Sequence, residues 1–118
     1  MSNSNSNTRL AAQGALEAVN AGALLIDVRS EAGRGRDGEL KGAIVIDKPD
    51  VFDVLSKRLR KASDDQKIII FCGSIKGSGP VVESLTQAGF AGVYDVDGGF
   101  QALRGAGLPL KPRAAAAA

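Results

Sequence analysis

The chain contains one cysteine, no histidine and no long run of apolar residues. A single cysteine cannot form a disulfide within the chain, so we expect a reduced, cytoplasmic setting rather than a secreted scaffold. No apolar run approaches the roughly 20 residues of a membrane-spanning helix, and the amino terminus lacks the basic-then-apolar pattern of a signal peptide. The sequence therefore predicts a soluble cytoplasmic protein with no membrane partner.

Neither sign of charge dominates the composition. The 15 Lys and Arg residues stand against 13 Asp and Glu residues, the net charge is +2, and the charges are interspersed. Nucleic acid is therefore not an expected partner. The length of 118 residues and the hydrophobic content of 44% predict one domain with a core of its own. We expect this domain over residues 8–112, between disordered tails at 1–7 and 113–118.

Short apolar runs alternate along the chain with stretches that are compatible with helices. The sequence contains no internal repeat. The runs predict strands over residues 23–26, 43–46, 67–71 and 92–96. Helices are expected over residues 8–20, 50–62 and 80–88, and in a short segment that opens at 98–99. Residues 29–41 are polar, charged and glycine-bearing, which predicts a loop. This order favours an α/β domain with a parallel sheet between helices.

Cys72 lies where the apolar run 67–71 gives way to a stretch of small residues. The pattern predicts strand, loop and helix, with the thiol at the sheet edge where open α/β folds bind ligands. Loop N–H groups and the positive end of the following helix, with Ser78 as its expected N-cap, would favour the reactive thiolate. Since the chain has no histidine, a Cys-His dyad is excluded, and the loop itself must activate the thiol.

Each of these features also has a simpler interpretation. A lone cysteine at a strand end is often a small buried hydrophobic residue. Lys76 is either an anion clamp in the loop or an ordinary solvated lysine. The cluster of Arg34, Arg36 and Lys41 is either a solvated face or a patch that attracts an anionic donor.

Four segments together resemble the rhodanese-like sulfurtransferases. They are Leu25-Ile26-Asp27-Val28-Arg29, Gly38-Glu39-Leu40-Lys41-Gly42-Ala43, the Cys72 loop, and the stretch from Gly98-Gly99-Phe100 to Gly107-Leu108-Pro109. Their order and spacing extend the resemblance from about Leu24 to Leu110. The resemblance implies a three-layer α/β fold, in which helices flank both faces of a mostly parallel five-stranded sheet.

The resemblance also implies a chemistry. In this family a cysteine takes a sulfane sulfur from a donor such as thiosulfate or 3-mercaptopyruvate and passes it on as a persulfide. Cys72 would be the catalytic nucleophile, and Asp27 and Arg29 match positions that frame the site. The substrate-binding cradle would comprise Gly73, Ser74, Ile75, Lys76, Gly77 and Ser78. We expect no metal and no organic cofactor, a small anionic sulfur donor, and a thiol or protein acceptor.

The loop departs from the family pattern at two positions. Gly77 stands where many single-domain members have arginine, and Ile75 stands where they have glycine. The β-branched Ile75 resists positive φ, and Lys76 cannot reproduce the bidentate fork of an arginine. Phosphatase activity is not expected, because related phosphatases need a longer loop that closes on an arginine. The alternative to a sulfurtransferase is a catalytically weak module that binds a partner or senses oxidants through Cys72.

Overall fold

A computed structural model describes residues 9–57, 66–73 and 75–111, with the backbone alone at 75–77. It contains a five-stranded sheet in the order β1-β5-β4-β2-β3, in which every pair of neighbours is parallel. The strands are β1 (Arg9–Leu10), β2 (Leu24–Asp27), β3 (Ile44–Val45), β4 (Ile68–Phe71) and β5 (Val93–Val96). The predicted α/β fold is confirmed. The expected tails, 1–7 and 113–118, lie outside the described residues.

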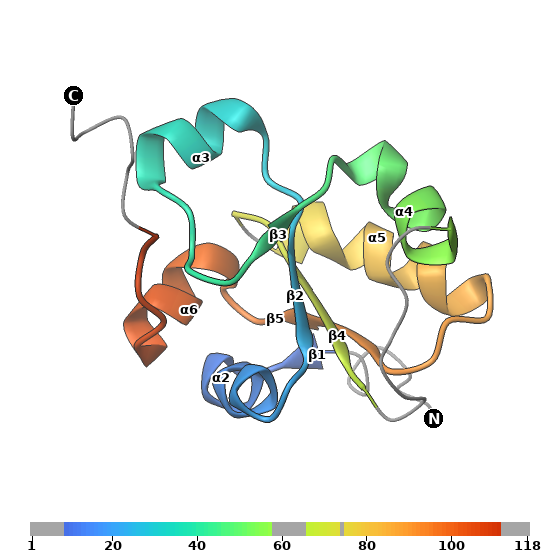
Figure 1. The fold of residues 1–118 in the computed structure, drawn as a ribbon, viewed down its shortest axis with the longest axis horizontal. Coiled ribbons are helices and arrows are strands. Elements are labelled where there is room, and N and C mark those ends of the chain that lie inside the picture. The colour runs from blue at the N-terminus through green and yellow to red at the C-terminus, as the bar shows by residue number, and fades with distance from the viewer. Residues whose placement is uncertain (1–8, 58–65, 74, 112–118) are drawn as a thin grey trace.

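Helices cover both faces of this sheet. They are α2 (Ala12–Asn20), α3 (Glu31–Asp37), the 3-10 helix η1 (Lys48–Asp50), α4 (Val51–Lys57), α5 (Ile75–Gln87) and α6 (Gly99–Ala106). Figure 1 shows α2 and α6 together on one face, α4 and α5 on the other, and α3 beyond the carboxyl end of β2. In the part of the chain that the structure describes, no helix is long and apolar enough to cross a membrane.

The central strand β4 supplies both core layers. Ile68 and Ile70 pack into the layer under α4 and α5, whereas Ile69 and Phe71 pack into the layer under α2 and α6. Successive side chains of a strand point to opposite faces, and all four residues are at most 1% exposed. Burial on both sides explains why β4 is a continuous apolar run. Cys72 extends the alternation to the α4 and α5 side, where it packs partly buried against the core.

The segment predicted as a loop over residues 29–41 contains the helix α3, so that prediction is wrong. Ser30 is the N-cap, and its Oγ accepts a hydrogen bond from the Gly33 N–H at 3.1 Å. Glu31 in the first turn and arginines in the last turn complement the helix dipole. Capping and charge order therefore form a helix despite two glycines inside it.

The first element of the described chain also differs from the prediction. Arg9 and Leu10 form the edge strand β1, paired with β5, and the helix begins only at Ala12. Residue 8, where this helix was expected to begin, lies outside the described residues. The helix expected from Asp50 begins at Val51, after η1, and its predicted end at 62 also lies outside them.

A partly buried ion pair fastens β1 to the sheet. The Asp95 carboxylate is 2% exposed and accepts hydrogen bonds from Arg9 Nε and Nη2, both at 3.1 Å. These hydrogen bonds raise the pKa of Arg9 above its ordinary value. Because that pKa is higher in the folded chain, the contribution of Arg9 to stability is present below the ordinary arginine value and is lost only above it.

Replacing Arg9 with Met should lower the free energy of unfolding by about 1–3 kcal/mol, because Asp95 would stay buried without a counter-charge. This range is below that for a fully buried pair, since the Arg9 side chain is 36% exposed. Urea unfolding measures the change. Arg36→Met is the control, because the pair of Arg36 with Asp37 is exposed and should matter little. Equal effects of the two variants would contradict the role of the Arg9 pair.

Candidate active site

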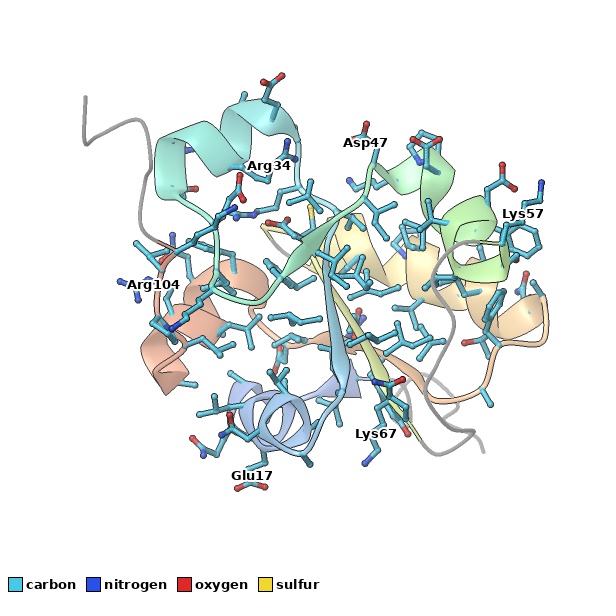
Figure 2. The ribbon with its side chains drawn as sticks, in the orientation of Figure 1. Glu17, Arg34, Asp47, Lys57, Lys67 and Arg104 are labelled. Atoms are coloured by element: carbon cyan, nitrogen blue, oxygen red, sulfur yellow. The ribbon has the colours of Figure 1, made fainter. Side chains whose placement is uncertain are left out.

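Cys72 directly follows the central strand β4, at the carboxyl edge of the sheet. Figure 2 shows Arg34 and Asp47 at this end of the molecule, and Glu17 and Lys67 at the opposite end. The thiol is half-buried. The structure thus places the cysteine at the edge where parallel α/β sheets bind their ligands.

The amino end of α6 closes on the peptide that joins Cys72 to Gly73. The Phe100 N–H donates a hydrogen bond to the Cys72 carbonyl oxygen at 2.9 Å. A Cβ at Gly99 would lie 2.6 Å from that oxygen and 2.9 Å from the Gly73 oxygen, and Gly99 has a φ of +58°. Glycine alone accommodates both the close approach and the left-handed backbone. The Gly98-Gly99 pair therefore holds the backbone of Cys72 as well as opening a helix.

Asp27 and Arg29, the predicted framing residues, form a buried ion pair. Their exposed fractions are 0% and 4%. Arg29 Nη2 donates to Asp27 Oδ2 at 2.8 Å, and Arg29 Nε donates to Asp27 Oδ1 at 3.1 Å. Arg29 Nη2 also donates to the Gly38 carbonyl oxygen at 2.6 Å, and the guanidinium lies 4.0 Å from the centroid of the Phe100 ring. The pair thereby ties the end of β2 to the segment after α3 and to α6.

This ion pair lies on the face of the sheet opposite to the thiol. Asp27 is the register partner of Phe71, which belongs to the α2 and α6 layer, whereas Cys72 packs against the α4 and α5 layer. Among the described residues, no hydrogen bond joins the pair to the Cys72 side chain. The pair acts on the site indirectly, because it packs against Phe100, whose N–H binds the Cys72 carbonyl.

The basic cluster expected from Arg34, Arg36 and Lys41 does not form one patch of free charge. Arg34 Nη1 donates to the Arg29 carbonyl oxygen at 2.7 Å, and its Nε lies 3.6 Å from a Glu39 carboxylate oxygen. Arg36 pairs with the carboxylate of the next residue, and Lys41 is exposed. The two arginines are thus occupied by neighbours, which favours a structural role over attraction of a donor.

The helix behind the cysteine begins earlier than predicted. α5 starts at Ile75 rather than near Pro80, so Ser78 lies inside the helix and is not its N-cap. Proline is common in the first turn of helices, so the sequence predicted that this helix begins at Pro80. Pro80 has no N–H, so the carbonyl of Lys76 loses its partner within the helix.

The cradle is only partly described. Ser74 lies outside the described residues, and so do the side chains of Ile75 and Lys76. Their expected roles in substrate binding stay predictions. Gly73 is exposed, and Ser78 is fully buried.

A cavity of about 320 Å³ lies on the thiol's side of the sheet, a feature that the sequence did not indicate. Its walls come from η1, α4 and α5. Two of its lining residues, Val51 and Leu85, belong to the core layer against which Cys72 packs. Its volume is within the range of small-molecule sites. The described residues contain no group of three or more His, Cys, Asp or Glu side chains that could hold a metal ion.

The protein is thus an α/β domain in which a cysteine directly follows the central strand of a parallel five-stranded sheet. The family model of the rhodanese-like domain matches residues 11–106. The chain belongs to the rhodanese-like domain family, as its sequence motifs indicated.

Solved structures share the fold. The rhodanese-like domain of an Anabaena protein has a TM-score of 0.73 and 23% identity, over 90% of this chain and 80% of that chain. A rhodanese-related protein from Thermoplasma volcanium has a TM-score of 0.69 and 24% identity, over 88% of this chain and 97% of that chain. A Rhodopseudomonas palustris protein of unknown function, a possible tyrosine phosphatase, has a TM-score of 0.73 and 22% identity, over 88% of this chain and 84% of that chain. These identities show the fold alone.

Replacing Gly99 with Ala should lower the free energy of unfolding by about 2–4 kcal/mol, through left-handed strain and the clash with the Cys72 carbonyl. Gly105→Ala is the matched control in the same helix, because a Cβ there meets nothing within 4 Å. The control should be stabilised by about 0.5–1 kcal/mol, owing to the higher helix propensity of alanine. Thermal unfolding of both variants provides the test, and a harmless Gly99→Ala would refute the close approach.

Replacing Arg29 with Lys should lower the free energy of unfolding by about 2–4 kcal/mol, because lysine keeps the charge but not the fork that binds Asp27 and Gly38. Arg36→Lys is the control, since that side chain is exposed. Denaturant unfolding of both variants distinguishes them. If Arg29→Lys is no more harmful than its control, the ion pair does not carry the framing role assigned to it.

Proposed function

We propose that this protein is a rhodanese-type sulfurtransferase or sulfane-sulfur carrier that uses Cys72 as its nucleophile. The observation that carries the proposal is the position of the only cysteine, half-buried between the central strand β4 and α5 in a rhodanese-like fold. Nucleophiles at this position can meet a substrate from solvent while the sheet fixes their backbone.

The transfer would proceed in two steps. The Cys72 thiolate attacks the outer sulfur of thiosulfate, so that a bond forms to Sγ while the sulfur–sulfur bond of the donor breaks and sulfite leaves. With 3-mercaptopyruvate the carbon–sulfur bond of the donor breaks instead. The proton of the donor's own thiol moves to the carbon that has lost the sulfur, and pyruvate leaves. A thiophilic acceptor then attacks the outer sulfur and regenerates the thiolate. The donor product departs before the acceptor reacts, which is a ping-pong sequence.

Backbone amides would supply much of the binding for an anionic donor. The first N–H groups of a helix have no partner within that helix, and α5 begins three residues after Cys72. The helix dipole favours negative charge at the same end. In this proposal the cradle consists of Gly73, Ser74, Ile75, Lys76 and Gly77. Lys76 would add a positive charge.

A second candidate function is a rhodanese-like module that binds a partner or senses oxidants. The observation in its favour is Gly77, which replaces the arginine of many family members. Loss of that guanidinium removes a bidentate anion contact. Such a module would form a sulfenate or a mixed disulfide at Cys72 but would not accept sulfur from a donor.

Intact-protein mass spectrometry distinguishes the two functions. The reduced protein, mixed with thiosulfate or with 3-mercaptopyruvate, should gain the mass of one sulfur atom, and cyanide or a reductant should remove it. Cys72→Ser is the control and should gain nothing. If neither donor adds sulfur although the thiol alkylates readily near neutral pH, the sulfurtransferase proposal is refuted and the binding or sensing module remains.

A further inference from the structure

Ser78 is a buried polar side chain without a hydrogen bond. Its exposed fraction is 0%, and its Oγ has no hydrogen-bond partner among the residues that the structure describes. Burying a hydroxyl without a partner costs free energy, and most buried polar groups in folded proteins are paired. The Ser78 hydroxyl is therefore available to a ligand or to a modified side chain that reaches it.

Ser78 faces the sheet at the cysteine end of α5. The spacing of Ser78, Val82 and Leu85 places them on one side of the helix. Val82 and Leu85 belong to the core layer against which Cys72 packs. Ser78 lies one turn closer to the start of α5 than Val82, so it is the member of this stripe nearest to the cysteine.

The charged groups near Ser78 are already paired. At the next residue, Gly79, a Cβ would lie 3.5 Å from Arg9 Nη2 and 3.6 Å from Asp95 Oδ2. Both Asp95 oxygens accept hydrogen bonds from Arg9. Successive residues of a helix differ in direction by about 100°, so Ser78 does not share the direction of Gly79, and its Oγ forms no hydrogen bond to this pair. Its hydroxyl is therefore not needed by the ion pair that holds β1.

We propose that the Ser78 hydroxyl binds the outer sulfur of a Cys72 persulfide. This inference rests on the proposed function, because it requires that Cys72 carries a transferred sulfur. In the thiol form Ser78 forms no hydrogen bond to Sγ. A persulfide extends the side chain by one sulfur–sulfur bond of about 2.05 Å, and its terminal sulfur is a stronger acceptor when it is ionised.

The proposed contact would favour the loaded protein over the empty one. The hydroxyl is unpartnered before transfer and donates to sulfur afterwards, so its hydrogen bond stabilises only the persulfide state. An interaction that exists in one state and not in the other shifts the equilibrium between them. Ser78 would thus slow the loss of sulfur to unintended acceptors while the persulfide waits for its acceptor.

Ser78→Ala separates this role from a structural one. The variant loses an unpaired buried hydroxyl, so its thermal midpoint should stay equal or rise, whereas its persulfide should decay several-fold faster than that of the wild type. Ser84→Ala is the matched control, because Ser84 is an exposed serine on the same helix. The control should match the wild type in both measurements. Equal persulfide half-lives in wild type and Ser78→Ala, followed by intact mass, would overturn the inference.

The loading method keeps the two proposals apart. Inorganic polysulfide installs the persulfide without relying on the protein to accept sulfur from thiosulfate or 3-mercaptopyruvate. If those donors fail but polysulfide loads Cys72, the proposed function fails while the decay comparison still tests Ser78.

The wild type provides a second measurement in case Ser78→Ala does not fold. Loading the persulfide should raise the thermal midpoint of the wild type, because the buried hydroxyl gains its partner. Ser78→Thr, which keeps a hydroxyl, should retain part of this rise. A wild-type midpoint that does not rise on loading would count against the contact.

Discussion

The geometry of the site depends on the buried ion pair between Asp27 and Arg29. Removing two charges from water is costly, and here the cost is offset by several hydrogen bonds and by the stacking of the guanidinium on Phe100. One side chain thereby joins the end of β2, the Gly38 carbonyl and the start of α6. The first turn of α6 in turn holds the Cys72 carbonyl. The backbone of Cys72 is thus fixed from the face of the sheet that does not carry the thiol.

Strand alternation separates this support from the chemistry. Asp27 and Phe71 face the α2 and α6 layer, whereas the next residue after Phe71, Cys72, faces the α4 and α5 layer. The thiol's side holds the cavity and the unpartnered hydroxyl of Ser78. Differences in the loop after Cys72 can therefore change binding and reactivity while the ion pair still fixes the fold around it.

The sequence identified what a local pattern can encode. β4 was predictable because a strand buried on both faces is a continuous apolar run, and α6 was predictable from the Gly98-Gly99 pair. β1 was missed because two residues carry no periodicity, and α3 was missed because its glycines hid a helix that Ser30 caps. The position of Cys72 followed from the end of β4. The contact between Arg29 and Phe100 and the cavity beside α5 could not be predicted from the sequence, because each depends on how distant segments pack.

The composition of the loop bears on how an anionic sulfur could be held. The chain has no histidine, and Gly77 stands at the position of the family's arginine. The remaining donors proposed for the site are backbone amides, the Ser78 hydroxyl and the charge of Lys76. Neutral donors form weaker hydrogen bonds to an anion than a guanidinium does. A phosphate dianion would lose most from this change, since arginine binds it through two parallel hydrogen bonds. A persulfide carries a single charge and is already attached covalently, so weaker donors can orient it and still release the sulfur to an acceptor. The missing arginine therefore argues more strongly against phosphate chemistry than against sulfur transfer.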